Sequence, residues 1–284
     1  MSAVSRAEYS EELVWIESED GIRLDGVVIR PAARGSRPVV VVHVHGFTGR
    51  FSHPAHVLVG RGLARHGVTS VSGNNRGWAF GETTQRRAGP VVIGSGWERF
   101  EECPLDVGAW VSFAAGLGFE AVVLLGHSFG APKAVYYQAV RQDPRVRALV
   151  LAPPGRARLP EIDPGVLAQA ERLVAEGRGT DLLPWGSFRD GALSAQTLLD
   201  HARLDPFGVR SAEAPVGRVR CPILAFYGSE EPAVGTPVEL ELIRRNAAAA
   251  ARVDTRMVAG ADHSYAGRGP EVADLIAEWL DSLP

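Results

Sequence analysis

The segment that most constrains the fold of this chain is a continuous β-branched run, Pro38-Val-Val-Val-Val-His-Val-His45. Runs of this kind are typical of strands that are covered on both faces, as in a parallel sheet. Similar apolar runs recur at 68–72, 121–125, 146–152, 222–227 and 253–258. Helical patterns lie between most of these runs, at about 53–66, 104–116, 130–141 and 237–250. The alternation predicts an α/β fold with a doubly wound, mostly parallel sheet.

The N-terminal end of the chain is predicted to extend this sheet, and the C-terminal end to cover it. Residues 13–18 and 22–30 alternate between apolar and polar side chains, and the turn signal Glu19-Asp20-Gly21 joins them. We expect them to form an antiparallel hairpin at the sheet edge, which gives an eight-stranded sheet. A final segment, 270–283, begins with Pro270 and carries an apolar stripe at helical spacing. It is predicted to be a helix that packs on the sheet.

Two segments interrupt the strand and helix rhythm. Residues 73–103 form a long Gly-rich connection, and long ordered loops are often functional, so we expect this one to border the active site. Residues 153–215 show helical patterns at about 164–177 and 192–202 and no strand signal. We interpret them as a helical cap inserted into one domain, whose core is formed by 1–152 and 216–284.

The strongest local motif is Val122-Val-Leu-Leu-Gly126-His-Ser128-Phe-Gly130-Ala131. A GxSxG sequence places its serine on a sharp turn between a strand and a helix, where the flanking glycines relieve a crowded backbone crossing. The pentapeptide alone is a weak signal. Here an apolar strand leads into it and a helical pattern leads out, so Ser128 is predicted to be a nucleophile.

A serine hydroxyl needs a base that takes its proton and a carboxylate that orients this base. His263 follows the last predicted strand on a loop, where its imidazole can reach the end of the sheet. His127 is expected to point away from its neighbour Ser128 and to pack against nearby loops. The carboxylate candidates are Glu230 and Glu231, which follow the strand at 222–227, and Asp262, beside the histidine.

The GxSxG turn (the nucleophile elbow), a histidine near the C-terminus and an acidic residue between them resemble the α/β-hydrolase superfamily. The similarity extends over about residues 13–283. The superfamily commonly has Gly-x-x-Asp after this strand, so the resemblance favours Glu231 as the acid, with glutamate in place of aspartate. It also identifies His45-Gly46-Phe47-Thr48-Gly49 as an HG-type oxyanion loop. The implied oxyanion donors are the backbone N–H groups of Phe47 and Phe129.

The resemblance implies a serine hydrolase that cleaves a carboxylic ester, lactone or thioester through an acyl-enzyme on Ser128. One alternative uses the same triad for C–C cleavage, cyclisation or acyl transfer in biosynthesis. Another is a non-catalytic ligand-binding protein on a hydrolase fold. Trp78, Trp97 and Trp185 are candidates for the lining of an apolar acyl pocket, although ordinary core packing explains each of them as well.

Other residues indicate whether a metal ion, a nucleotide cofactor or a catalytic lysine is to be expected. His43 and His45 share one strand face, but the further ligands of an HxHxDH metal site are absent, so no metal is expected. Neither GxxxxGK[ST] nor GxGxxG occurs, so no nucleotide cofactor is expected. Of the 30 basic residues only Lys133 is a lysine, and its place on the helix behind Ser128 argues against a Ser-Lys dyad.

Composition limits the partners and the location. The 30 basic and 33 acidic side chains give a formal charge of −3, and no arginine run predicts nucleic-acid binding. No apolar run reaches the roughly 18 residues that cross a bilayer, and the N-terminus has no apolar signal core. We therefore expect a cytoplasmic protein that binds an apolar small-molecule acyl substrate. The sequence does not indicate its oligomeric state.

Overall fold

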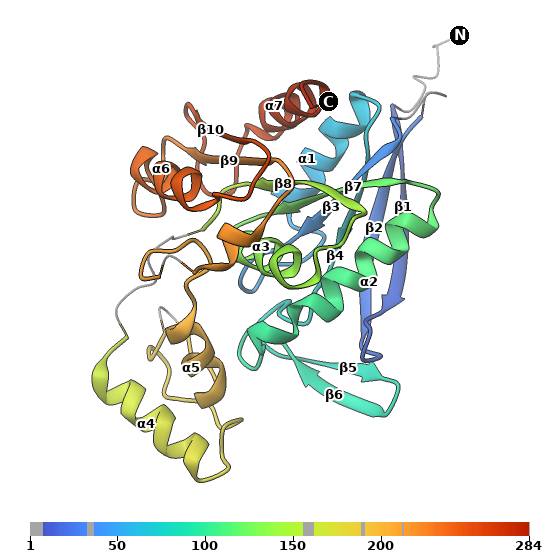
Figure 1. The fold of residues 1–284 in the computed structure, drawn as a ribbon. Helices are drawn as coiled ribbons and strands as arrows, with labels where there is room; N and C mark the ends of the chain where they lie inside the picture. Colours follow the sequence, from blue (N-terminus) through green and yellow to red (C-terminus); the bar gives the residue numbers. More distant parts are fainter. Residues whose placement is uncertain (1–7, 33–36, 156–161, 189–190, 212, 284) are drawn as a thin grey trace.

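In the computed structural model, which describes residues 8–32, 37–155, 162–188, 191–211 and 213–283, one eight-stranded sheet runs through the molecule (Figure 1). Its strand order is β1-β2-β4-β3-β7-β8-β9-β10. The strands are β1 (Tyr9–Glu17), β2 (Arg23–Pro31), β3 (Val39–Val44), β4 (Thr69–Gly73), β7 (Ala121–Gly126), β8 (Val146–Leu151), β9 (Ile223–Gly228) and β10 (Val253–Val258). Strand β2 pairs antiparallel with β1 and β4, and every pairing from β4 to β10 is parallel. The predicted mostly parallel sheet is confirmed.

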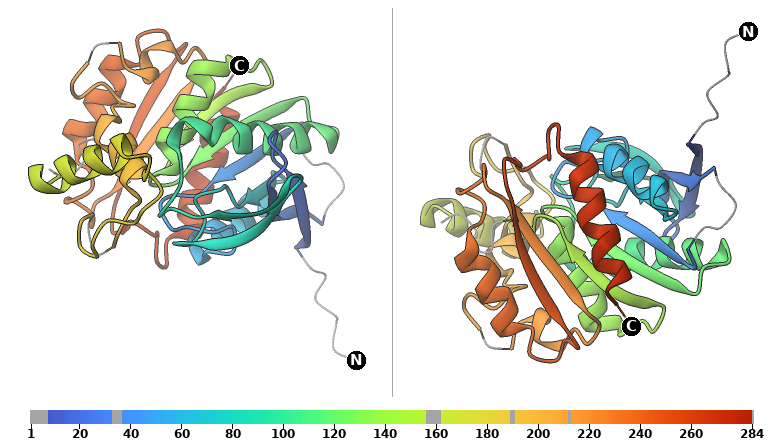
Figure 2. Two further views of the ribbon diagram at one scale, coloured as in Figure 1. Left: turned by 90° about the horizontal axis from the view of Figure 1, so that it is seen from below. Right: turned by 90° about the horizontal axis from the view of Figure 1, so that it is seen from above.

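Helices cover both faces of the sheet, as the doubly wound prediction requires. Helices α1 (Pro54–Arg65) and α7 (Gly269–Asp281) pack together on one face, and Figure 2 shows them side by side in the view from above. The opposite face carries α2 (Cys103–Gly116), α3 (Gly130–Arg141) and α6 (Pro237–Asn246).

Strand β7 shows why helices pack on both faces of the sheet. Its side chains alternate between the two cores, with Val122 and Leu124 facing α2 and α3, and Val123 and Leu125 facing α1 and α7. All four are buried. Burial of one such side chain stabilises the fold by about 1.5–3 kcal/mol, so a strand that is apolar at every position is stable only between two helical layers.

The Gly-rich connection at 73–103 contains more regular structure than the sequence predicts. It forms a two-stranded hairpin of β5 (Glu82–Arg86) and β6 (Gly89–Ile93), followed by the short 3₁₀ helix η1 (Phe100–Glu102). Strand β5 has the sequence Glu-Thr-Thr-Gln-Arg and lies mostly exposed, outside the main sheet. It therefore lacks the apolar alternation from which a strand is predicted.

The segment 153–215, which we call the insertion, connects β8 to β9 and carries α4 (Pro164–Ala175), α5 (Ala195–Arg203) and, at its end, the 3₁₀ helix η2 (Pro215–Arg218). The predicted helices at 164–177 and 192–202 are confirmed in type and place; α4 ends two residues earlier, and α5 begins three residues later and ends one residue later. Both have a side-chain N-cap, Asp163 for α4 and Ser194 for α5. The insertion has an apolar cluster of its own, formed by Ala170, Leu183, Phe188, Leu193, Ala195, Leu198 and Leu199. None of the helices in the described part of the chain is long and apolar enough to cross a membrane.

Candidate active site

Ser128 lies on the turn between β7 and α3 with a backbone φ of 54°, which is unusual for a residue other than glycine. The turn is possible because its neighbours lack side chains. A Cβ atom at Gly130 would overlap the carbonyl oxygen of Val44, and one at Gly126 would meet the Ala131 backbone at 2.5 Å. The backbone N–H of Ser128 donates to the carbonyl of Pro153 at 2.8 Å. This is the strained, fixed turn that GxSxG predicts.

Three side chains form one continuous hydrogen-bonded chain at this turn. The Ser128 Oγ lies 2.9 Å from His263 Nε2, and His263 Nδ1 lies 2.7 Å from Glu231 Oε2. His263 comes from the loop between β10 and α7, and Glu231 from the loop after β9. The Gly228 N–H donates to the other oxygen of Glu231 at 2.8 Å, which fixes the carboxylate in its buried position. Three predicted residues, distant in sequence, therefore meet in the predicted order.

The other two carboxylate candidates face elsewhere. Glu230 is exposed and accepts a hydrogen bond from the Ser229 hydroxyl at 3.1 Å. Asp262 accepts the backbone N–H groups of Ser264 and Ala266 and so stabilises the turn that carries His263. Of the three candidates, the structure places only Glu231 against the imidazole.

His127 is hydrogen-bonded to the backbone of the loop that carries His263. Its Nε2 lies 2.8 Å from the His263 carbonyl oxygen, so Nε2 carries the proton and donates it. Burial, together with the nearby His263, lowers the pKa of His127 to about 3, so the ring is neutral. The expectation that His127 packs against neighbouring loops is confirmed. Its bond to His263 has no signal in the sequence other than its place beside Ser128.

The predicted oxyanion loop, 45–49, lies directly against the turn that carries Ser128. A Cβ atom on Gly46 would be 2.7 Å from Ser128 Cβ and 3.0 Å from the Phe129 nitrogen, so only glycine allows this approach. The Asn75 N–H donates to His45 Nε2 at 3.0 Å, which leaves the ring proton on Nδ1, 2.9 Å from the Gly46 carbonyl oxygen. Burial lowers the pKa of His45 to about 3, and the charge of Lys133 contributes, so this ring is neutral as well.

The two imidazoles considered as a metal pair point to different neighbours. His43 packs against the ring of His56 at a centroid distance of 4.2 Å, whereas His45 bonds to Asn75 and Gly46. Within the described ranges, no group of three or more His, Cys, Asp or Glu side chains is arranged to hold a metal ion.

The three tryptophans predicted to line a pocket do not form one group. Trp97 and Trp185 flank Phe80 at centroid distances of 5.7 and 6.0 Å, and Trp97 Nε1 donates to the Thr180 carbonyl at 3.0 Å. These contacts join the 73–103 loop to the insertion. Trp78 instead packs against the core on the side of α2 and α3.

Sequence reasoning missed the aromatic contacts of the two predicted oxyanion residues, Phe47 and Phe129. The ring of His201, on α5, stacks on Phe129 at 4.7 Å and meets Phe47 edge-on at 6.1 Å. Phe188 of the insertion lies 5.8 Å from Phe47. The only available signal was that His201 falls on the same helical face as Leu198 and is therefore buried. The insertion thus contacts the side chains of both predicted oxyanion residues, Phe47 and Phe129.

Comparison with known proteins places this site within a family. Residues 41–275 match the sequence profile of the alpha/beta hydrolase family. The chain belongs to this family. No curated protein matches this alpha/beta hydrolase by sequence.

Solved structures similar to this alpha/beta hydrolase span nearly its whole length. Est1E from Butyrivibrio proteoclasticus with bound ferulic acid has a TM-score of 0.66 at 18% identity, over 95% of this chain and 98% of that one. DcsB in complex with a substrate analogue has a TM-score of 0.71 at 17% identity, over 96% and 99%. A soluble variant of monoglyceride lipase from Saccharomyces cerevisiae has a TM-score of 0.65 at 16% identity, over 99% and 97%. At these identities the likeness concerns the fold.

Proposed function

We propose that this alpha/beta hydrolase is a serine hydrolase that cleaves a carboxylic ester, lactone or thioester with an apolar acyl group, through an acyl-enzyme on Ser128. The observation that carries the proposal is the uninterrupted chain from Ser128 Oγ through His263 to Glu231, with contacts of 2.9 and 2.7 Å. Such a chain supplies what a serine hydroxyl lacks, namely a base within hydrogen-bond reach and a carboxylate that orients it.

In this mechanism His263 Nε2 takes the proton of Ser128 as Oγ attacks the acyl carbon. The buried Glu231 carboxylate accepts the Nδ1 proton, sets the tautomer and stabilises the imidazolium that forms. The N–H groups of Phe47 and Phe129 stabilise the negative charge on the former carbonyl oxygen. His263 then returns the proton to the leaving group, and water attacks the acyl-enzyme by the same steps.

Two features support an apolar acyl group bound beneath a cap. The insertion contacts the two proposed oxyanion residues through aromatic rings, Phe47 through Phe188 and Phe129 through His201, so these rings of the insertion lie next to the proposed oxyanion hole. Similar folds include Est1E with bound ferulic acid and a monoglyceride lipase in complex with a substrate analogue. We therefore propose that the insertion forms part of the acyl pocket.

The first test compares two adjacent glutamates. On p-nitrophenyl butyrate, Ser128→Ala is expected to lower kcat at least ~10⁴-fold, and Glu231→Gln about 10³–10⁴-fold because the amide disturbs the tautomer of His263. Glu230→Gln, one residue away and exposed, serves as the matched control and should stay within about twofold of wild type. Equal effects of the two glutamine variants would contradict the assignment of the acid.

A fluorophosphonate probe and isotope-labelled water separate the alternatives. Ser128 of the wild-type protein should react covalently with the probe, whereas a non-catalytic binding protein would not. Hydrolysis in H₂¹⁸O places one heavy oxygen in the released acid, whereas cyclisation or acyl transfer to another nucleophile places none. Absence of both labelling and ester turnover would refute the proposed function.

A further inference from the structure

The only lysine of the chain is completely buried behind the candidate active site. Lys133 lies in the first turn of α3, and its Nζ is 2.5 Å from Glu98 Oε1 and 2.9 Å from Asn75 Oδ1. Burial of an unpaired ammonium is very costly, and a buried ion pair is at best weakly stabilising. A lysine here therefore calls for an explanation beyond the stability of the fold.

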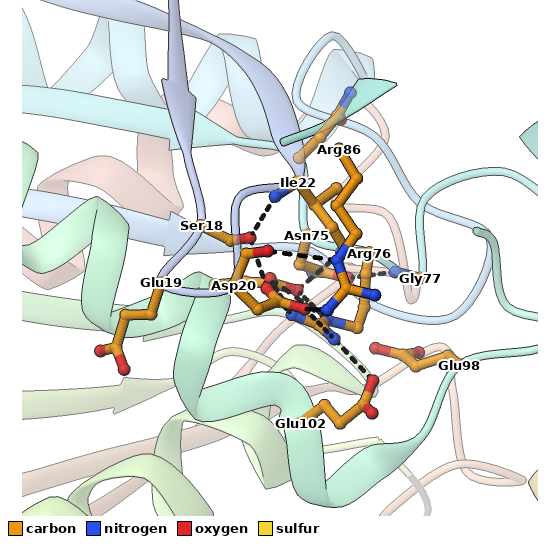
Figure 3. A network of polar contacts seen from close by, with 12 residues as sticks. Ser18, Glu19, Asp20, Ile22, Asn75, Arg76, Gly77, Arg86, Glu98 and Glu102 are labelled. Carbon is orange, nitrogen blue, oxygen red and sulfur yellow. Dashed lines mark hydrogen bonds and ion pairs between the residues drawn. The ribbon is translucent and has the colours of Figure 1, made fainter. Parts of the chain in front are cut away.

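Asn75 connects this lysine to the oxyanion loop. Its Oδ1 accepts from Lys133, while its side-chain nitrogen donates to the His45 carbonyl at 3.2 Å and its backbone N–H donates to His45 Nε2. Figure 3 shows Asn75, Arg76 and Glu98 gathered in one polar network on the 73–103 loop. Three of the polar groups of Asn75 are thus used to hold His45 and Lys133.

His45 in turn fixes the orientation of one proposed oxyanion donor, the N–H of Phe47. Its Nδ1 donates to the carbonyl oxygen of Gly46, and this carbonyl belongs to the same planar peptide group as the N–H of Phe47. A bond that fixes the carbonyl oxygen therefore also fixes the direction of the N–H. The Gly46–Phe47 peptide is oriented through His45, Asn75 and Lys133 in turn.

Lys133 also contacts the residue that carries the other donor. Its Nζ lies 5.2 Å from the centre of the Phe129 ring, within cation–π range. Because Phe129 is the N-cap of α3 and Lys133 lies in its first turn, the position of this helix start relative to Asn75 depends on where the ammonium is held. Glu98 balances the charge, so the effect of the lysine on the site is geometric rather than a long-range field.

We propose that Lys133, together with Glu98, is a positioning residue that holds the Phe47 and Phe129 amides of the oxyanion hole in mutual register. The inference rests on the proposed function, because it concerns the reaction at Ser128. An oxyanion hole works through donors placed before the reaction begins. Loss of Lys133 should therefore weaken stabilisation of the tetrahedral intermediate and leave substrate binding nearly unchanged.

The test removes both charges at once, so that no unpaired charge is left buried. In the double variant Lys133→Met/Glu98→Gln, kcat on p-nitrophenyl butyrate, per active site titrated with a fluorophosphonate, should fall 10- to 100-fold while KM changes less than threefold. A trifluoromethyl ketone forms a tetrahedral adduct with the serine. Its Ki should rise by the same factor by which kcat falls. The affinity of an unreactive alcohol inhibitor of the same size should not change.

Two further variants keep the test decisive. Asn75→Ala cuts the link to His45 and leaves the ion pair intact, so it should reproduce the loss of kcat even where the double variant fails to fold. Gln138→Leu removes another buried polar side chain of α3, one that bonds to the Asp143 carbonyl away from the site, and should lower the melting temperature without changing kcat per active site.

The outcomes distinguish this inference from the proposed function. Wild-type kcat per titrated site in both the double variant and Asn75→Ala, even with a lower melting temperature, would show a purely structural ion pair and would overturn the inference alone. A wild-type protein that neither hydrolyses the ester nor reacts with the probe would overturn the proposed function and this inference with it.

Discussion

Two polar clusters, each with buried members, keep polar groups in the interior in opposite ways. The charged cluster, on the side of α2 and α3, consists of Asp20, Arg76, Glu98, Glu102, Asp106 and Lys133. Arg76 is matched by Asp20, Glu102 and Asp106, and Lys133 by Glu98, all at hydrogen-bond distance. Figure 3 shows Asp20 and Glu102 around Arg76. The histidine cluster, between β3, α1 and the elbow, consists of His43, His56 and His127. Its rings pack in series at centroid distances of 4.2 and 5.1 Å.

The difference follows from the acid–base chemistry of the side chains. Burial acts against the charge of Arg76, yet the surrounding carboxylates, Asp106 foremost, raise its pKa, so it stays charged and must be paired. An imidazole can avoid the cost of burial by losing its proton. Burial holds the pKa of His43 and His56 well below the usual value, and in the described part of the chain their Nε2 atoms have no hydrogen-bond partner. One cluster should therefore be sensitive to mutation, and the other to acid.

The largest expected effect is loss of stability in mild acid through the histidine cluster. The folded-state pKa values are lowered, to about 3 for His127, whereas an unfolded histidine titrates near 6.5. The stabilisation is thus complete above pH 6.5 and is lost as the pH falls toward 3, because only the unfolded chain then takes up the protons. Between pH 7.5 and 5.5 each ring contributes up to ~1.4 kcal/mol, or about 4 kcal/mol for the three.

Urea unfolding at the two pH values measures this difference. His56→Gln removes one titrating ring and should reduce the pH dependence by about a quarter, because His45, whose pKa is also lowered to about 3, titrates over the same range as the three cluster rings. An unfolding free energy that is the same at pH 7.5 and 5.5 would show that the cluster takes up protons without unfolding, and would contradict the contrast drawn between the two clusters.

The charged cluster should respond to a mutation instead of to pH. Asp106 is fully buried and accepts both the backbone N–H of Arg76, at 2.8 Å, and its guanidinium. Asp106→Ala leaves a buried guanidinium short of its main partner, and should lower the free energy of unfolding by about 3 kcal/mol. The loss should be equal at pH 7.5 and 5.5. Glu241→Ala, which breaks an exposed pair with Arg244, is the control and should leave the urea midpoint unchanged.

The sequence predicts well whatever depends on local pattern. Strand β7 is apolar at every position and its neighbours β3 and β8 nearly so, so their burial between two helical layers could be predicted. GxSxG requires a turn that places Ser128 at the carboxyl end of the central strand β7. The choice of Glu231 over Glu230 depended on the resemblance, because the direction of a side chain in the loop after β9 follows from the Gly228 N–H contact and not from spacing.

Contacts between distant loops could not be predicted in this way. The single lysine was noticed, but its partners Asn75 and Glu98 lie 58 and 35 residues earlier on an irregular loop, where no periodicity indicates which side chains face α3. The β5–β6 hairpin was missed for a related reason, since an exposed polar strand carries no burial pattern. In both cases the determining interactions are non-local.

The smallest expected effect tests whether the histidine cluster acts on the reaction as well as on stability. His127 connects the histidine cluster to the candidate active site, since it contacts the ring of His56 and donates to the His263 carbonyl. His127→Phe keeps a ring of similar size and loses this donor, so the loop that carries His263 should be held less firmly. We expect kcat to fall about 10-fold, or ~1.4 kcal/mol of activation free energy, with KM unchanged.

His56→Phe is the matched control, because it replaces the neighbouring ring of the same cluster, which lies one contact further from His263. If bonding to the loop is what matters, His56→Phe should shift the melting temperature and leave kcat per titrated site unchanged. Equal losses of kcat in the two variants would mean that packing of the whole cluster positions His263. The histidine cluster would then support the site as a unit, as the charged cluster is proposed to support the oxyanion hole, and the two would differ only in how they respond to acid.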